Sequence, residues 1–501
     1  MRSSVSVSAS RMMASGVPGG PALVRKHAKA WASALLSIAL LTSGCSSLTD
    51  TVSDAVGGSA PVNGEPGYVT GFLGGVVADE PHAALIARDV LSAGGTAADA
   101  AVALAFALTV TLPSRAGLGG GGACLMFTPG NGVEAATFLP RAPEHPAPGD
   151  RPAALPMLAR GLFALHAKYG DRQFGSLIAP AELLARQGMT VSRAFARDLA
   201  VVAGPLGADP AARAVFFTNG SPVAEGATLL QPGLAGTLTQ LRQAGVGDLY
   251  QGTLARLLAD ASRDSGGGLT VADMRGALPN LGPALMLPAG DEQVAFLPPP
   301  ADGGLATAAA FQVLQKDPAA LPAAGERALA VAARFRQGGG DPQALLAAPS
   351  LPASTMPPLA ASTTFATLDR HGNAVVCAMT MNNLFGTGRV AAGTGILLAA
   401  SPAWQTPPLL SAAIAFGGGS RPAFRAAVGG SGQAGAPVAA ALALTQALAD
   451  TGAAAHPLPV PAPDPGRANV IQCNAHLPGD SAACGWATDP RGAGLALGSA
   501  P

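Results

Sequence analysis

The sequence "ASTTFATLDRHGNAV" occupies residues 361–375 and predicts a β-hairpin. Three hydroxyl residues, Ser362–Thr364, begin a segment that is typical of a strand, and Asp369–Asn373 has the composition of a tight turn. Ser and Thr suit the first positions of a strand for local reasons alone. A second interpretation is that one of these three hydroxyls is a nucleophile, and the rest of the chain must distinguish the two.

A hydroxyl residue at the start of a strand can cleave its own chain when a flexible segment precedes it. Its oxygen attacks the carbonyl of the preceding residue, the chain breaks through an ester, and the hydroxyl residue becomes a new N-terminus. The freed α-amine has a reference pKa of about 8 and can act as the base for its own hydroxyl. Residues 317–361, rich in Ala, Gly and Pro, predict an exposed linker directly before Ser362.

Composition excludes several classes of function. The 501 residues carry no formal net charge, and 49% are hydrophobic, which is enough for a large core in one or two domains. No basic cluster suggests a nucleic-acid partner. The histidines form no HExxH or HxxxH pair, and there is no CxxC, so a metal site is not expected.

Two common catalytic motifs are also missing. The segment "GLGGGG", residues 117–122, lacks the Lys and Ser/Thr that complete a phosphate-binding loop. It therefore predicts a tight turn where backbones pack closely. No GxSxG segment is present to form the nucleophile elbow of a serine hydrolase.

The N-terminus predicts export. Three basic residues between positions 25 and 29 precede the apolar run "AWASALLSIALLTSGC", which is too short for a transmembrane helix. The end of the run resembles a bacterial lipobox with Cys45 as the lipidated residue, although Thr42 stands where Leu is usual. We expect residues 1–45 to be a signal peptide and 46–65 a tether. The protein would then be periplasmic, with a lipid anchor as its only contact with the membrane.

Four further cysteines divide into two pairs. Cys473 and Cys484 flank the polar loop "NAHLPGDSAA" and predict a disulfide in an oxidising compartment. Cys124 and Cys377 lie in apolar, strand-like runs, and we expect them to be free thiols in the core.

The remaining pattern is that of an α/β protein. Thr96 and Asp99 resemble a capping box before a helix that is apolar on nearly all faces. Strands with helices packed on them indicate a layered α/β domain. The predicted helices cover residues 81–95, 97–112 and 435–452, and the main predicted strands cover 67–80, 363–369, 374–381, 393–399, 469–473 and 484–489.

Several segments, in the same order, resemble the gamma-glutamyltransferase family. They include "VVADEPHAALIARDVLSAGGTAADAAVALAFAL" (76–108), "SRAGLGGGGACLMF" (114–127) and "TLDRHGNAVVCAMTMNNLFGTGRVAAGTGILL" (367–398). The resemblance implies a four-layer αββα sandwich of the N-terminal nucleophile hydrolase type. It also implies a precursor that cuts itself into a large subunit, here 66–361, and a small subunit, here 362–501. Such enzymes pass a gamma-glutamyl group from glutathione or related compounds to water, amino acids or peptides, without a cofactor.

The resemblance places the nucleophile at the start of the hairpin. Counting back from "DRHGNAV" without a gap puts the catalytic position on Ser362 and the following family residue on Thr363. Deleting one residue would make Thr363 the nucleophile, but a one-residue slip would turn the intervening side chains to the other face of the strand. Ser362 is therefore favoured, with cleavage after Ala361. Thr380 and Asn382 match the family's TxN motif, in which the Thr supports the nucleophile and the Asn contacts substrate.

Two further matches are looser. The segment "VGGSG", residues 428–432, resembles the glycine turn whose N–H groups stabilise the oxyanion, and it contains Gly430 and Ser431. Ser411 would match one of two adjacent substrate-binding serines, and Leu410 occupies the other position.

The substrate pocket departs from the family. Leu139 stands where an Arg holds the glutamyl carboxylate, and Arg141 can replace it only if the loop bends differently. Residues 399–404 contain no acid to hold the α-amino group. Three hypotheses follow: a gamma-glutamyltransferase, the same fold acting on another amide, or a non-catalytic family lipoprotein.

Overall fold

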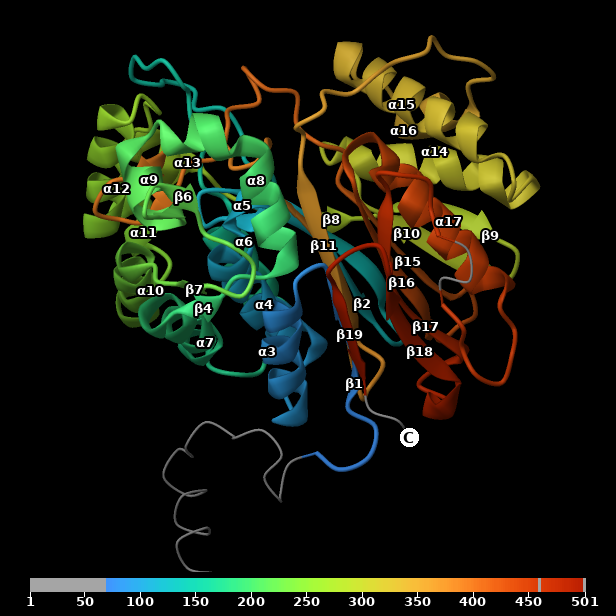
Figure 1. The fold of residues 1–501 in the computed structure, drawn as a ribbon. Coiled ribbons are helices and arrows are strands. Elements are labelled where there is room, and N and C mark those ends of the chain that lie inside the picture. Colours follow the sequence, from blue (N-terminus) through green and yellow to red (C-terminus); the bar gives the residue numbers. More distant parts are fainter. Residues whose placement is uncertain (1–68, 458–460, 499–501) are drawn as a thin grey trace, which may run out of the picture. The chain divides into compact units, whose positions relative to one another are not determined.

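Two antiparallel β-sheets lie face to face in the computed structural model, which describes residues 69–457 and 461–498 (Figure 1). The predicted signal peptide, Cys45 and the tether lie outside the described residues. The first sheet has the order β19 (Leu495–Gly498), β1 (Gly74–Ala78), β11 (Ser362–Asp369), β12 (Ala374–Thr380), β2 (Gly121–Thr128), β3 (Gly132–Phe138) and β8 (Asn280–Pro283). The second has the order β18 (Cys484–Thr488), β17 (Arg467–Leu477), β16 (Phe424–Ser431), β15 (Ser411–Gly417), β10 (Glu292–Phe296) and β9 (Leu285–Ala289).

Helices cover the outer face of each sheet, so the described chain has four layers in the order αββα (Figure 1). The first sheet is covered by α3 (Pro81–Ser92), α4 (Ala97–Thr111), α5 (Pro113–Ala116), α6 (Leu158–Tyr169), α7 (Phe174–Gln187), α8 (Arg193–Gly207), α9 (Pro210–Phe216), α10 (Pro232–Ala244), α11 (Asp248–Gln251), α12 (Thr253–Asp264) and α13 (Val271–Gly276). The second is covered by α14 (Asp302–Lys316), α15 (Leu321–Gly338), α16 (Pro342–Ala347) and α17 (Ala436–Ala449).

Short elements complete the layers. They are the two-stranded pairs β4 (Met189–Thr190) with β7 (Thr228–Leu229), β5 (Phe217–Thr218) with β6 (Ser221–Pro222), and β13 (Val390–Ala391) with β14 (Ile396–Leu397), and the 3-10 turns η1 (Gln433–Gly435) and η2 (Ser481–Ala483). Among the described residues, no helix combines the length and the apolar character needed to cross a membrane.

The period-two pattern of the strands assigns their side chains to two different cores. In β11, Phe365 packs into the core under the helices, whereas Ala366 and Leu368 pack into the core between the sheets. Successive side chains of a strand point to opposite faces, so this alternation fixes the register of the whole hairpin. The turn predicted at residues 369–373 is present, closed by the Asp369 N–H donating to the Asn373 carbonyl at 3.0 Å.

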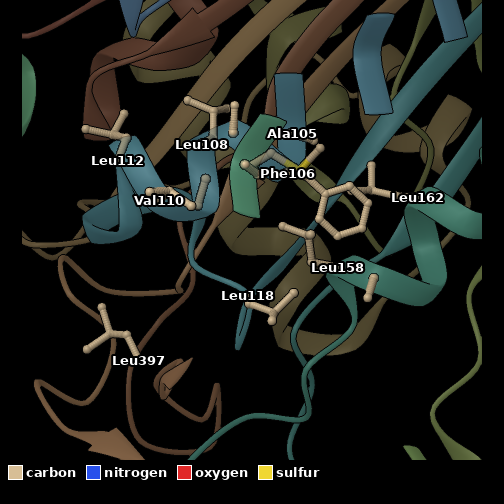
Figure 2. Close-up of a cluster of buried hydrophobic side chains, with 14 of the residues drawn as sticks. Ala105, Phe106, Leu108, Val110, Leu112, Leu118, Leu158, Leu162 and Leu397 are labelled. Atoms are coloured by element: carbon tan, nitrogen blue, oxygen red, sulfur yellow. The ribbon is translucent and has the colours of Figure 1, made fainter. Parts of the chain in front are cut away.

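Helix α4 is the buried centre of the first helical layer. All of its residues are buried, and Phe106 lies beside Leu158 and Leu162 of α6 (Figure 2). The predicted capping box is present, because Thr96 and Asp99 each accept a hydrogen bond from the other's backbone N–H.

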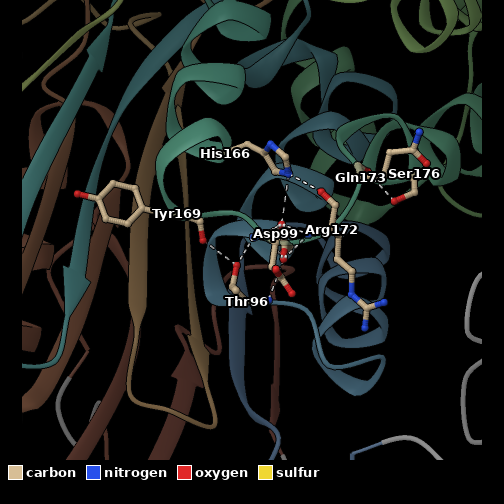
Figure 3. Close-up of polar contacts among 8 residues, drawn as sticks. Thr96, Asp99, His166, Tyr169, Arg172, Gln173 and Ser176 are labelled. Carbon is tan, nitrogen blue, oxygen red and sulfur yellow. Dashed lines mark hydrogen bonds and ion pairs between the residues drawn. The ribbon is translucent and has the colours of Figure 1, made fainter.

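The carboxylate of Asp99 also organises the loop after α6. It accepts from the backbone N–H groups of Asp171 and Arg172, and His166 lies 3.5 Å from it (Figure 3). This fully buried acid therefore has several partners, as a buried carboxylate requires.

The exposed linker expected over residues 317–361 is wrong for most of its length. Helices α15 and α16 occupy Leu321–Gly338 and Pro342–Ala347. Ala324, Ala328 and Val331 recur every three or four residues and are buried in the core outside the second sheet. Because Ala is the strongest helix former, the Ala-rich composition produced helices here. The segment directly before Ser362 that has neither helix nor strand is therefore short, and it covers residues 348–361.

The free core thiols expected at Cys124 and Cys377 are also wrong. These residues face each other across the β2–β12 pair and form a disulfide. Cys473 and Cys484 form the other disulfide, across the β17–β18 pair. Both bridges join directly opposed residues of antiparallel neighbours, where side chains come close together.

Candidate active site

The first residue of β11 is Ser362, and it is directly opposed to Thr380, the last residue of β12. Directly opposed residues of an antiparallel pair share a face. For this pair it is the face between the sheets, because Ala366 and Ala378, an even number of residues away, pack there. Thr364 lies on the same face, where a Cβ on Gly429 of the second sheet would be 2.7 Å from the Thr364 Cβ. Glycine at 429 therefore allows the sheets to approach beside the site.

The peptide bond before Ser362 is polarised by Thr380. The Thr380 hydroxyl donates to the Ala361 carbonyl oxygen at 2.8 Å, and its oxygen accepts from the Asn382 N–H at 2.7 Å. Ser362 is only 1% exposed, and its Oγ has no hydrogen-bond partner among the described residues. A buried hydroxyl without a partner is costly and unusual, and it is a feature of functional positions.

The hydroxyl of Thr363, unlike that of Ser362, has a hydrogen-bond partner within the described residues. It donates to Asp79 Oδ2 at 3.0 Å, and the Thr364 N–H donates to the same oxygen at 3.1 Å. Asn469, from the second sheet, donates to the other oxygen of Asp79 at 2.9 Å. The geometry thus favours Ser362 over Thr363 as the nucleophile, because only Ser362 has an uncommitted hydroxyl on the face between the sheets.

An arginine network that the sequence reasoning missed supports the start of β11. Arg115 forms a two-point ion pair with Asp198 at 2.6 and 2.7 Å, and Ser114 donates to the same carboxylate at 2.7 Å. A further Arg115 N–H lies 3.4 Å from the Ser362 carbonyl oxygen. Burial opposes the charge of Arg115, but the carboxylate of Asp198 outweighs it and raises the pKa of the guanidinium above its ordinary value.

The Ser362 cavity has a volume of about 270 Å³. Its wall includes Ser431 and Gly432 from the end of β16, together with Asp79 and Arg115. The end of the predicted glycine turn therefore lies beside Ser362. Gly432 has a φ of +106°, which suits glycine, and it ends the strand at this point.

Two predicted residues, Gly430 and Ser411, line neither the Ser362 cavity nor a second cavity, which lies around Thr380. Gly430 lies inside β16, opposed to Ser411 on one side and Ala468 on the other. A Cβ on Gly430 would be 2.2 Å from the Ala436 carbonyl oxygen, so this position faces α17. Ser411 shares that face, and its hydroxyl donates to the Leu409 carbonyl at 3.1 Å. The residue beside it, Leu410, is the one that faces the space between the sheets.

The Thr380 cavity has a volume of about 300 Å³. It contains Asn382, whose side-chain amide donates to the Pro140 and Ala400 carbonyls at 3.0 and 2.8 Å. Asn382 thereby holds together the loops that contain Pro140 and Ala400. Because Thr380 and Ser362 are directly opposed, the two cavities open on neighbouring residues.

The walls of the Thr380 cavity are mainly apolar. They include Leu139, Leu278, Leu410 and the prolines at 140, 300, 402, 407 and 408. Arg141 also lines this cavity, and it donates to the Gly276 carbonyl at 2.8 Å while remaining exposed.

One acid lines the Thr380 cavity, and it is already paired. Burial raises the pKa of Asp302, while a two-point contact with Arg336 opposes that shift. The cavity therefore offers a guanidinium but no unpaired carboxylate among its lining residues.

Similarity to known proteins agrees with this arrangement. A model of the gamma-glutamyltranspeptidase family matches residues 83–329. The glutathione hydrolase proenzyme of Bacillus subtilis (strain 168) is 33% identical over 257 residues, which are 46% of this chain and 43% of that protein. The glutathione hydrolase proenzyme of Escherichia coli (strain K12) is 29% identical over 379 residues, 65% of each chain. This chain belongs to the gamma-glutamyltranspeptidase family.

Membership places the chain in the N-terminal nucleophile hydrolase superfamily. The matched region spans less than two thirds of the length of each of these relatives. Among solved structures, a cephalosporin acylase from Bacillus halodurans is similar with a TM-score of 0.67 and 20% identity, covering 88% of this chain and 98% of that one. At this identity the likeness concerns the α/β fold alone.

Proposed function

We propose that this family member cleaves itself between Ala361 and Ser362 and then uses Ser362 as an N-terminal nucleophile for acyl transfer. In self-cleavage, Ser362 Oγ bonds to the Ala361 carbonyl carbon, the C–N bond breaks, and the hydroxyl proton goes to the leaving nitrogen. Water then hydrolyses the ester, giving a carboxylate at Ala361 and a free amine and hydroxyl at Ser362. That amine is the base for each later attack on an amide.

One observation carries this proposal. The Thr380 hydroxyl donates to the carbonyl that Ser362 would attack, while the Ser362 hydroxyl itself is buried and has no partner in the described part of the chain. A donor already aimed at the carbonyl oxygen stabilises the negative charge that develops there during attack. In the non-catalytic alternative, such a polarised bond beside an uncommitted hydroxyl would serve no purpose.

For the substrate, the first candidate is a gamma-glutamyl amide such as glutathione, with water, an amino acid or a peptide as acceptor. The names of the two curated relatives support it, since both are glutathione hydrolase proenzymes. Asn382, Ser431 and the exposed Arg141 would contact the substrate, and Ser411 and Gly430 would support the second sheet behind it.

The second candidate is an amide whose acyl group has no free α-amine, and the Thr380 cavity favours it. Leu139 and Leu410 line this cavity, and its one acid is held by Arg336. An ammonium group placed here would lose its partner, which typically costs about 2–5 kcal/mol. An apolar acyl chain that ends in a carboxylate would instead meet leucines and Arg141.

Two chromogenic substrates that differ by one amine separate these candidates. Gamma-glutamyl-p-nitroanilide and glutaryl-p-nitroanilide share the scissile bond and the distal carboxylate, and the Ser362→Ala variant supplies the background rate. The second candidate predicts a kcat/KM at least about 30-fold higher for the glutaryl compound, the equivalent of 2 kcal/mol. A preference for the gamma-glutamyl compound would return the assignment to the first candidate.

Location and assembly complete the proposal. The two disulfides are consistent with an extracytoplasmic location. We place the protein in the periplasm, exported by residues 1–45 and anchored through a lipid on Cys45. Its processed form would consist of a large fragment ending at Ala361 and a small fragment beginning at Ser362.

A further inference from the structure

The Cys124–Cys377 disulfide lies across the proposed cleavage site in the sequence. Its two cysteines are 253 residues apart, and the bond between Ala361 and Ser362 falls between them. Cys124 is on β2 and Cys377 on β12, and these strands are neighbours in the first sheet. Cleavage after Ala361 would therefore leave one cysteine of this bridge in each fragment.

We infer that the processed enzyme is a covalent two-chain molecule in which this single bridge joins the large fragment to the small one. The inference rests on the proposed cleavage. The other bridge cannot perform this role, because Cys473 and Cys484 both follow Ser362 and belong to the small fragment. The structure thus contains one bridge between the fragments and a natural control within one of them.

The position of the bridge gives the link a function at the site. Strand β12 lies between β2 of the large fragment and β11, which carries Ser362. Cys377 is opposed to Phe365 of β11 on one side and to Cys124 on the other, and Thr380 follows three residues later. Fixing Cys377 to β2 therefore holds the β11–β12 hairpin, with Ser362 and Thr380, against the large fragment after the peptide bond that joined the fragments is gone.

Burial protects the link in the folded enzyme. Both Cys124 and Cys377 have no exposed surface. The bridge forms when the two thiols give up two protons and two electrons to a disulfide donor by thiol–disulfide exchange. Because the attacking thiol needs access to a sulfur atom, we expect the bridge to form before the helical layer packs on the first sheet and to resist reductants until the protein unfolds. A covalent link also makes reassociation of the fragments intramolecular, and so independent of protein concentration.

Intact mass spectrometry of the exported full-length protein, unfolded with free thiols alkylated, tests this inference. Without reductant, the expected result is one species heavier than the intact chain by one water, and with reductant it is two fragments. The Cys124→Ser/Cys377→Ser variant should give two fragments without reductant, and Cys473→Ser/Cys484→Ser should still give one species. Should the first variant fail to fold, the disulfide-linked peptide containing residues 124 and 377 can be sought in a digest of the wild type.

The outcomes separate this inference from the proposal on which it rests. If the unfolded wild-type protein gives two separate fragments without reductant, the inference of a covalent link is wrong, while self-cleavage still holds. A single chain that survives reduction with no added water would overturn both the cleavage and the two-chain assembly.

Discussion

The start of β11 and the walls of the Thr380 cavity are neighbours that are built differently. At the start of β11, Ser362 and Thr380 are placed by strand register, so a shift of one residue would destroy their geometry. The cavity walls come from loops around residues 139–141 and 399–410, whose side chains can change without moving the sheet. The comparison indicates that reaction chemistry is constrained by the sheet, whereas acyl specificity can diverge in the loops.

The largest effect on self-cleavage is expected at Thr380, which strand register places opposite Ser362. Thr380→Val keeps the shape of the side chain but removes the donor to the Ala361 carbonyl. Losing one such donor typically slows catalysis by about 100- to 1,000-fold. We expect self-cleavage, followed on reducing denaturing gels after synthesis, to slow by that factor. Thr380→Ser is the matched control because it retains the hydroxyl, and a normal rate in Thr380→Val would break the comparison.

A smaller effect is expected in the cavity wall. Arg141→Met keeps much of the aliphatic length but removes the charge that we assign to the distal carboxylate of the acyl group. Hydrogen bonds to charged groups contribute about 1.5–3 kcal/mol, so KM for glutaryl-p-nitroanilide should rise about 10-fold or more, with self-cleavage unchanged.

Arg151→Met is the control for the Arg141 variant. Arg151 is also exposed and also donates to a backbone carbonyl, that of Thr387 at 2.9 Å, but it does not line the Thr380 cavity. Equal KM values for wild type and Arg141→Met would remove this residue from substrate binding.

The smallest effect is expected at the hydroxyl next to the nucleophile. Thr363→Ala loses the hydrogen bond to the Asp79 carboxylate, which should lower the free energy of unfolding by about 1.5 kcal/mol, the low end for a charged partner. Self-cleavage should continue because the Ser362–Thr380 pair is unchanged. Urea denaturation gives the first quantity and reducing gels give the second, and loss of cleavage in a folded Thr363→Ala protein would shift the nucleophile by one residue.

Local patterns predicted much of the fold, and the family resemblance located the candidate site. The hairpin of β11 and β12, the cap of α4 and the Cys473–Cys484 bridge each depend on residues close together in the sequence. The ungapped count to Ser362 depends on the same hairpin.

Long-range pairing explains most of what the sequence could not predict. The partnership of Cys124 with Cys377 requires β2 to lie beside β12, and no local pattern contains that information. The contact between Arg115 and Asp198, on α5 and α8, has the same origin. Asp79 gave a weak signal, as an acid near the end of the strand predicted over residues 67–80. The helices over 321–347 were missed because Gly and Pro at their ends outweighed the spacing of buried alanines.

The identity of the residue at the start of the small fragment tests the central claim most directly. N-terminal sequencing of the reduced, purified protein should give Ser362, Thr363 and Thr364 as the first three residues, and Ser362→Ala should remain a single, folded chain. A fragment that begins at any other residue, or a folded wild-type chain that is never cut, would contradict the assignment of Ser362 as the nucleophile.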